Sequence, residues 1–345
     1  MPLGTHVPVP TERPRGVRGW MLVFLVTAML AGVLGPGTPA TAHEAPGPEA
    51  PRPEAAAAEP AYLTLLFGRT QWEQRDPACS AILPNSITLG QVAQELQRRG
   101  LTGVGIVIVN WTSSTSTRTC NGRLASATWN DLATLRDTYG WTMVSGGKSH
   151  ADMTAMTTQQ QRAETCGSLP AFTDHGHTGA AGLFAYGNNK YSGSIQANVV
   201  STCFSYGRKY GSGVNARTKM TAPWFQSTVS YNGGACNDLS RACSDTGTHG
   251  GYRYALPGVV RALMQPAPGQ WSAVQFYRFV TGSRNDPADP TYAWNCTGSD
   301  PRLHWTTRAE IYCWEDYKAA LDAIPAGVTV TDPLTVARAW GRTVP

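Results

Sequence analysis

Two short stretches of the sequence hold histidines that could bind a metal ion. One stretch, SGGKSHADM, carries His150, and the other, DHGHTG, carries Asp174, His175 and His177. Side chains two residues apart in an extended segment face the same way, so both histidines of the second stretch could reach one metal. The alternative is a polar loop held by hydrogen bonds, with His150 as a turn or capping residue.

Three further stretches carry side chains suited to a sugar ligand. GRTQWEQRD contains Arg69, Trp72, Glu73 and Asp76, GNNKYSG contains Asn188 and Asn189, and LHWTT contains His304 and Trp305. An aromatic ring offers a stacking face and the polar groups offer hydrogen bonds to hydroxyls. The alternative for the first stretch is a solvated surface loop with one buried tryptophan, and the asparagines are also ordinary turn residues.

Other catalytic patterns give no competing interpretation. G-x-S-x-G, H-E-x-x-H, a P-loop and G-x-G-x-x-G are all absent from the sequence. Glu310 stands three residues after Thr307, which is the spacing of a capping box, so we expect Glu310 to play a structural role.

Short apolar runs alternate with helical patterns from Ala61 onward. We expect strands at 62–67, 104–109, 141–145 and 182–186, separated by helices at 88–99, 128–140 and 157–169. Thr88 and Gln91 have capping-box spacing at the start of the first helix. The alternation predicts an α/β fold in which helices cover a parallel sheet.

The pattern loosens after Tyr191 and becomes regular again near residue 273. We expect a strand at 273–280, a helix at 307–323, a strand at 327–331 and a short helix near the C-terminus. Parallel sheets place their functional residues just after the carboxyl ends of the strands. The stretches named above lie at or near such ends.

The N-terminal region predicts export from the cell. Three arginines precede an apolar run, and Ala40-Thr41-Ala42 follows it, so residues 1–42 have the pattern of a secretory signal peptide. The apolar run of about 15 residues is shorter than the ~20 that span a bilayer, so no membrane anchor is expected after cleavage. Residues 43–60, rich in Pro, Ala and Glu, predict a disordered tether before a single domain at 61–345.

Charge and cysteine content support a secreted globular protein. The formal net charge of +5 falls to +3 without residues 1–42, which is too mild to indicate a nucleic-acid partner. All eight cysteines follow the tether, and an even count in an exported chain favours four disulfides over a zinc site. The expected pairs join neighbours in sequence: Cys79–Cys120, Cys166–Cys203, Cys236–Cys243 and Cys296–Cys313.

Together these stretches resemble the secreted polysaccharide deacetylases, the NodB-homology enzymes of carbohydrate esterase family 4. The segment WNDLATLRDTYGWTMVSGGKSHADM is similar to the family's helix, strand and histidine motif, with Ser145, His150 and Met153 in matching positions. GLFAYGNN is similar to the family's next strand, and LHWTT to its late histidine segment, with His304 one place early. The resemblance implies a distorted (β/α) barrel that acts on a polysaccharide or cell-wall glycan.

The metal motifs of the family are incomplete in this sequence. Gly146 stands where the first histidine of the family motif belongs, and Phe67-Gly68-Arg69 stands where the family has Phe-Asp-Asp-Gly. Zinc needs three protein ligands and an open position, and the resemblance leaves only His150. Zinc is therefore disfavoured as a cofactor, and we expect the usual metal-dependent mechanism not to be intact.

Two functions stay open at this stage. The first is a deacetylase-type barrel that acts on or binds an extracellular polysaccharide through Arg69, Trp72, Asn188, Asn189 and Trp305. If it is catalytic, Glu73 or Asp76 would replace the missing carboxylates, as in a glycoside hydrolase with a carboxylate pair, with His150 and His304 as further candidates. The second is a carbohydrate-binding or structural module without catalysis that uses the same cleft.

Overall fold

The computed structural model describes most of the chain that follows the predicted tether. The described residues are 59–68, 85–112, 127–210, 214–217, 225–230, 248–249, 252–253, 261, 263–284, 294–298, 305–306 and 311–342. The predicted signal peptide and nearly all of the tether lie outside them. Within these ranges, no helix has the length and apolar character needed to cross a membrane.

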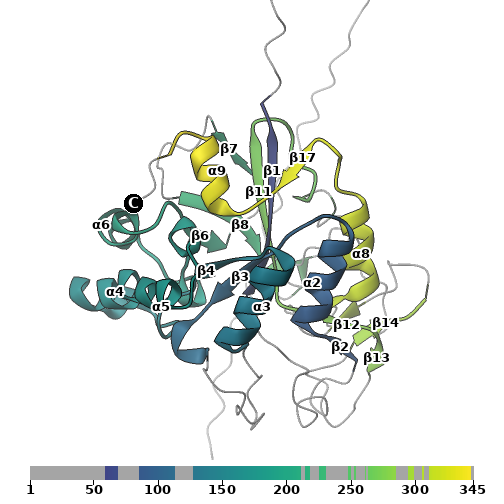
Figure 1. The fold of residues 1–345 in the computed structure, drawn as a ribbon, viewed down its shortest axis with the longest axis horizontal. Helices are drawn as coiled ribbons and strands as arrows, with labels where there is room; N and C mark the ends of the chain where they lie inside the picture. Colours follow the sequence, from purple (N-terminus) through teal and green to yellow (C-terminus); the bar gives the residue numbers. More distant parts are fainter. Residues whose placement is uncertain are drawn as a thin grey trace, which may run out of the picture. The chain divides into compact units, whose positions relative to one another are not determined.

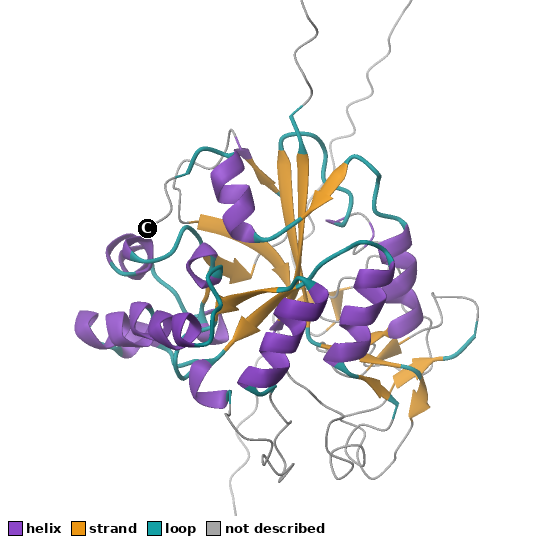
Figure 2. Ribbon diagram, viewed as in Figure 1, coloured by secondary structure: helices purple, strands orange, loops and turns teal. Residues whose placement is uncertain are grey.

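Seven parallel strands form a closed ring (Figures 1 and 2). In spatial order they are β1 (Ala61–Phe67), β3 (Val104–Val107), β4 (Thr142–Ser145), β5 (Phe184–Ala185), β6 (Gly207–Tyr210), β8 (Phe225–Ser230) and β11 (Gln270–Phe276). Each strand pairs in parallel with the next, and β11 pairs back onto β1 over Tyr62–Phe67. The pairings confirm the predicted α/β barrel.

Further strands extend or flank this barrel. β17 (Val328–Val330) adds in parallel to the start of β1, and β7 (Asn215–Ala216) pairs antiparallel with β11. Three small sheets stand apart from the ring. They contain β9 (Thr248–His249) with β10 (Tyr252–Arg253); β2 (Ser86–Ile87), β12 (Arg278–Val280) and β16 (Ile311–Cys313); and β13 (Gly282–Arg284), β14 (Trp294–Cys296) and β15 (Trp305–Thr306).

Helices follow the strands and lie outside the ring (Figure 2). They are α2 (Leu89–Arg98), α3 (Trp129–Tyr139), α4 (Thr158–Glu164), α5 (Leu169–Asp174), α6 (Gly193–Asn198), α8 (Trp314–Asp322) and α9 (Pro333–Ala339). Short 3-10 turns join them: η2 (Val109–Trp111), η3 (Met153–Ala155), η4 (Cys166–Ser168), η5 (Ala180–Gly182), η6 (Gly187–Asn189) and η7 (Val200–Thr202). The capping box of Thr88 and Gln91 is present at the start of α2, as predicted.

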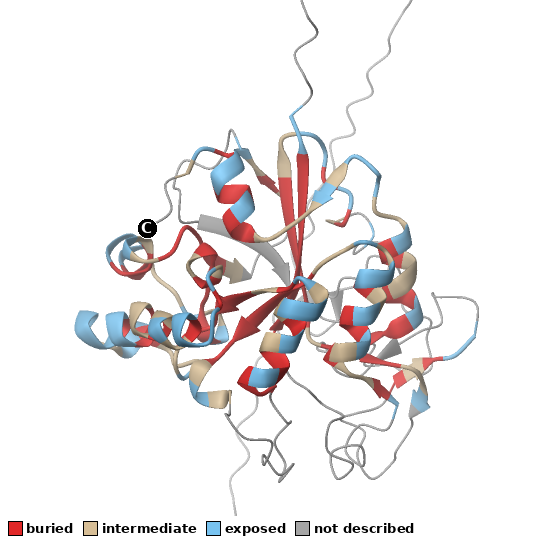
Figure 3. Cartoon of the chain, in the orientation of Figure 1, coloured by how far each residue is buried: buried red, intermediate tan, exposed pale blue. Residues whose placement is uncertain are grey.

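The strands are buried on both faces (Figure 3), which explains their continuous apolar sequences. Side chains of β1 alternate between two clusters: Leu63, Leu65 and Phe67 pack towards α2, α3 and α8, whereas Tyr62 and Leu66 point into the barrel. The interior cluster also includes residues of α9. Each fully buried large apolar side chain contributes about 1.5–3 kcal/mol, so both faces of the strands stabilise the barrel.

Three predicted elements differ from the structure. The helix expected at 157–169 ends at Glu164, because Thr165 leaves helical geometry (φ −90°, ψ −85°), and α5 starts after η4. The strand expected at 273–280 divides at Tyr277 into β11 of the barrel and β12 of a small sheet.

The helix predicted to start at Thr307 starts later in the structure, and Thr307 and Glu310 themselves lie outside the described residues. Ile311–Cys313 forms strand β16, which pairs with β12, so the helix begins only at Trp314. The apolar residues Ile311 and Cys313 lie in a buried cluster with Val280 and Trp294. This burial in a sheet outweighs the local capping signal.

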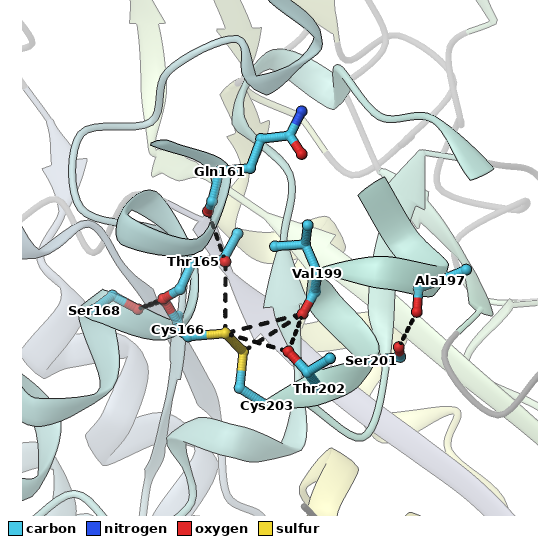
Figure 4. Close-up of a disulfide and its surroundings, with 10 residues drawn as sticks. Gln161, Thr165, Cys166, Ser168, Ala197, Val199, Ser201, Thr202 and Cys203 are labelled. Carbon is cyan, nitrogen blue, oxygen red and sulfur yellow. Dashed lines mark hydrogen bonds between the residues drawn. A yellow bond between two sulfur atoms is a disulfide. The ribbon is translucent and has the colours of Figure 1, made fainter. Parts of the chain in front are cut away.

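Two predicted disulfides lie within the described residues, and both are present. Cys166 pairs with Cys203, and Cys296 pairs with Cys313. Figure 4 shows the first, which joins η4 to the end of η7 beside the Thr202 hydroxyl, itself bonded to the Val199 carbonyl at 2.6 Å. The pairs Cys79–Cys120 and Cys236–Cys243 lie outside the described residues.

Candidate functional site

The carboxyl ends of three adjacent strands bring together one aromatic, one imidazole and one amide group. Trp111 follows β3, His150 follows β4 and Asn188 follows β5. The Trp111 and His150 ring centroids are 5.5 Å apart, and the Asn188 backbone N–H donates to His150 Nε2 at 3.3 Å. We refer to these three residues as the β3–β5 site.

His150 has an unusual backbone that its neighbours hold in place. Its φ is +63°, a left-handed conformation that non-glycine residues adopt rarely. Gly187 packs directly against the His150 backbone, since a Cβ on Gly187 would be 2.6 Å from the His150 carbonyl oxygen. The close approach requires glycine, so the end of β5 supports the loop that carries His150.

The accepted hydrogen bond decides what the His150 ring can do. Because Nε2 accepts a hydrogen bond from the Asn188 N–H, its lone pair points at the backbone. In the neutral ring, the proton then sits on Nδ1. Nε2 is therefore occupied, and His150 is placed as part of a polar surface rather than as a metal ligand through that nitrogen.

Positive side chains flank the β3–β5 site. Lys190 is exposed and its Nζ lies 4.0 Å from Asp152 Oδ2, a separation at which the ion pair contributes little. Lys209 Nζ lies 6.0 Å from the centre of the half-buried Tyr191 ring, within reach of a cation–π contact. Tyr191 also packs on Tyr186, with ring centroids 5.6 Å apart, so the surface next to Asn188 is aromatic as well as polar.

The zinc site implied by the resemblance does not fit the strand ends. A Cβ on Gly146 would be 3.1 Å from the Ile106 Cγ2 methyl and from the Ile108 Cγ1 methylene, so a histidine there would require these packed side chains to shift. At Gly68, a Cβ would lie 2.6 Å from the Tyr277 ring and closer still to the Gln275 amide. At both positions, a ligand side chain would require neighbouring side chains to move, further at Gly68 than at Gly146.

The second histidine stretch lies elsewhere, packed on α3. The exposed His175 ring stacks on Trp129 at 4.2 Å, and the His177 ring lies 5.9 Å from it. His177 is only 3% exposed, and neither ring nitrogen has a hydrogen-bond partner. Burial, followed by the charge of Arg136 and then of His175, lowers the pKa of His177 to about 4, so this ring is neutral at pH 7.

Asp174 ends helix α5 and is exposed. Across the described part of the chain, no three His, Cys, Asp or Glu side chains come together as a metal-binding group. The structure therefore places Asp174 at the end of α5, with the His175 and His177 rings beside Trp129 of α3, and it does not bring the three together with His150 as a metal-binding group.

Several sequence candidates fall outside the described residues. They are Arg69, Trp72, Glu73, Asp76 and His304. Trp305 begins strand β15, in a small sheet and not in the barrel. Asn189 ends the turn η6 next to Asn188, with a left-handed φ of +58°.

Sequence reasoning missed Trp111 and Tyr191, although it pointed to the chain just after Val109 and Tyr186. The signal was available, because an aromatic residue two to five positions after a predicted strand end lies where a parallel sheet places functional groups. Glu164 was also missed, since its role depends on contacts with the loop that carries His150.

Among known proteins, the chain is similar to solved structures that include deacetylases. No protein-family model and no curated protein matches the chain. A Mycobacterium smegmatis protein described as a polysaccharide deacetylase has a TM-score of 0.45 at 10% identity, covering 84% of this chain and 94% of that one. A chitin deacetylase from the fungal pathogen Colletotrichum lindemuthianum has a TM-score of 0.40 at 10% identity, with 83% and 89% covered.

A Streptococcus pyogenes deacetylase solved with acetate has a TM-score of 0.38 at 12% identity. The match covers 48% of this chain, which spans 62% of the length of that deacetylase.

Proposed function

We propose that this protein binds an extracellular polysaccharide at the β3–β5 site and does not use the zinc-dependent deacetylase mechanism. One observation carries the proposal. The strand ends that would supply the base and a zinc ligand are glycines closed in by packed side chains, while the neighbouring ends present Trp111, His150 and Asn188.

The chemistry of the β3–β5 site suits a sugar. Trp111 and Tyr191 are half-buried aromatic side chains, and a ring held in this way can stack on the apolar face of a pyranose. The exposed Asn188 amide and Lys190 ammonium add donors and an acceptor for hydroxyl groups. Sugar sites need this combination because each ring of the ligand has both C–H and O–H surfaces.

A hydrolase that works without metal is the second candidate. It would need two carboxylates about 5–10 Å apart. Among the described residues near the site, Asp152 caps η3 through Thr154 and Glu164 accepts hydrogen bonds from Ser149 and His150. Both carboxylates therefore have structural partners. Glu73 and Asp76 remain the candidates for this function.

Export is part of the proposal. The signal-like pattern of residues 1–42 and the two observed disulfides both suit an oxidising, extracellular compartment. An extracellular location would place the protein where a polysaccharide or cell-wall glycan is accessible.

Calorimetric titration with soluble oligosaccharides tests the proposal. Chitohexaose, xylohexaose and cellohexaose serve as probes, and at least one should bind the wild-type protein. Trp111→Ala and His150→Ala should each weaken that binding about tenfold or more, the size of a lost stacking or hydrogen-bonding group. The matched control is His175→Ala, which removes an exposed histidine stacked on Trp129, away from the site. Equal losses in all three variants, or no binding by any probe, would contradict the proposal.

A further inference from the structure

The loop between Gly147 and His150 donates several hydrogen bonds to Glu164, the last residue of helix α4. The Glu164 carboxylate accepts hydrogen bonds from the Ser149 N–H at 2.8 Å, the His150 N–H at 3.0 Å and the Ser149 hydroxyl at 2.9 Å. The Glu164 carbonyl accepts a further bond from the Lys148 N–H at 3.0 Å. Four donors from three consecutive residues thus converge on one residue.

This contact is buried and closely fitted. Glu164 is only 7% exposed, and a Cβ on Gly147 would lie 2.6 Å from the Glu164 carboxylate oxygen. Gly147 also has a φ of +87°, which glycine adopts without strain. Glycine at 147 therefore allows the carboxylate to reach the backbone of the next residues.

The loop would not hold this shape by local preference alone. His150 is left-handed, and such a conformation persists in a non-glycine residue only when its surroundings fix it. Hydrogen bonds to a carboxylate are stronger than bonds between neutral groups. The two bonds to Glu164 Oε1, one from each of two successive N–H groups, supply the constraint on one side of the loop.

The other side of Glu164 is also anchored. Glu164 ends α4, and Cys166, two residues later, is bonded to Cys203 (Figure 4). The α4 helix starts with a complete capping box of Thr157 and Gln160. The helix end that carries the carboxylate is therefore anchored on both sides.

We propose that Glu164 is a positioning residue that sets the left-handed conformation of His150, and through it the tautomer and orientation of the ring in the β3–β5 site. The role rests on the proposed function, since it concerns the same site. Glu164 acts through the backbone of Ser149 and His150, and the ring in turn accepts the Asn188 N–H and lies beside Trp111.

The test combines glycan titration with NMR of the histidine side chains. Long-range ¹H–¹⁵N spectra at pH 7.5 report which imidazole nitrogen carries the proton, and His150→Ala assigns the signal. The wild type should show the Nδ1-protonated tautomer. Glu164→Gln should move His150 towards the mixture of tautomers found in free histidine and weaken binding of the best hexasaccharide about tenfold, because a neutral amide oxygen holds the Ser149 and His150 N–H groups more weakly than the carboxylate does.

Two further variants make the result specific. Gln159→Ala changes an exposed residue of the same helix and should leave both measurements unchanged. Ser149→Ala removes only the hydroxyl bond to Glu164 and should shift His150 in the same direction by a smaller amount. The His177 signals report on folding and should stay the same in all variants.

The possible outcomes separate this inference from the proposed function. If no hexasaccharide binds the wild type, the proposed function fails, while the His150 tautomer still tests Glu164. If Glu164→Gln leaves the His150 tautomer as in the wild type, the positioning role is wrong. Should Glu164→Gln fail to fold, an unchanged His150 signal in Ser149→Ala would overturn the inference, and a shifted one would support it.

Discussion

The carboxyl ends of β1 and β4 differ sharply from the loops that follow β3, β4 and β5. At the first two, Gly68 and Gly146 are enclosed by neighbouring side chains, which would have to move for a ligand side chain. In the loops, hydrogen bonds to Glu164 and from Asn188 arrange His150 beside Trp111. The difference teaches that a barrel can close its metal-ligand positions by packing and still keep an ordered polar site at the same end.

The largest expected effect concerns the anchor of the β3–β5 site. The double variant Cys166→Ala, Cys203→Ala opens a 37-residue loop and should lower the free energy of unfolding by about 3–4 kcal/mol, measured by denaturant titration. The variant should also weaken glycan binding, because η4 follows Glu164 directly. The control Cys296→Ala, Cys313→Ala opens a 17-residue loop in the small sheets and should lower stability without changing glycan affinity. Equal glycan affinity in both variants would contradict the link between this disulfide and the site.

The next effect concerns the closed strand ends. Gly68→Asp and Gly146→His restore the residue types of the deacetylase motifs, and each should lower the free energy of unfolding by about 1–3 kcal/mol through overpacking. Neither variant, nor the two together, should bind zinc in a calorimetric titration. The control Gly193→Ala has open space around its Cβ and should change stability by only a few tenths of a kcal/mol. Tight zinc binding by the double variant would show that the strand ends are open enough for a metal.

The buried His177 should make the free energy of unfolding sensitive to acid. The folded protein holds the pKa of His177 at about 4, below its ordinary value of 6.5, so the unfolded chain takes up the proton first as the pH falls. The contribution of neutral His177 to the free energy of unfolding is therefore fully present above pH 6.5. It falls by up to about 1.4 kcal/mol per pH unit towards pH 4.

His177→Phe should remove this part of the acid sensitivity, because the ring makes no hydrogen bond that would be lost. Denaturant titrations at several pH values between 7 and 4 measure the slope. Subtracting the His177→Phe slope from that of the wild type isolates the contribution of His177. Identical slopes would mean that His177 is not buried in its neutral form.

Much of the barrel was predictable from the sequence because its first strands are buried on both faces. A continuous apolar run such as Val104–Val107 is typical of a strand that is buried on both faces. Capping boxes at Thr88 and Thr128 mark the helix starts. Strand β6 was not predicted, because its sequence, GRKY, contains two charged residues. Arg208 is 2% exposed within it, a burial that the sequence of the strand does not indicate.

The site was less predictable than the fold. The rule that parallel strands carry functional groups at their carboxyl ends indicated His150 and Asn188. Their contact depends on the pairing of β4 with β5, and the enclosure of Gly68 and Gly146 depends on side chains from other strands. Local sequence carries no information about such contacts. The sequence therefore showed that the ligand residues are absent at Gly68 and Gly146, but it did not show how closely these glycines are packed.

The central claim is that the β3–β5 site binds a glycan without a metal. The most direct measurement is a calorimetric titration of the best-binding hexasaccharide, performed once after exhaustive EDTA dialysis and once with added zinc, together with an assay for released acetate. The same dissociation constant is expected in both conditions, with no acetate release from hexa-N-acetylchitohexaose. Binding or acetate release that appears only with zinc, and disappears in His150→Ala, would contradict it.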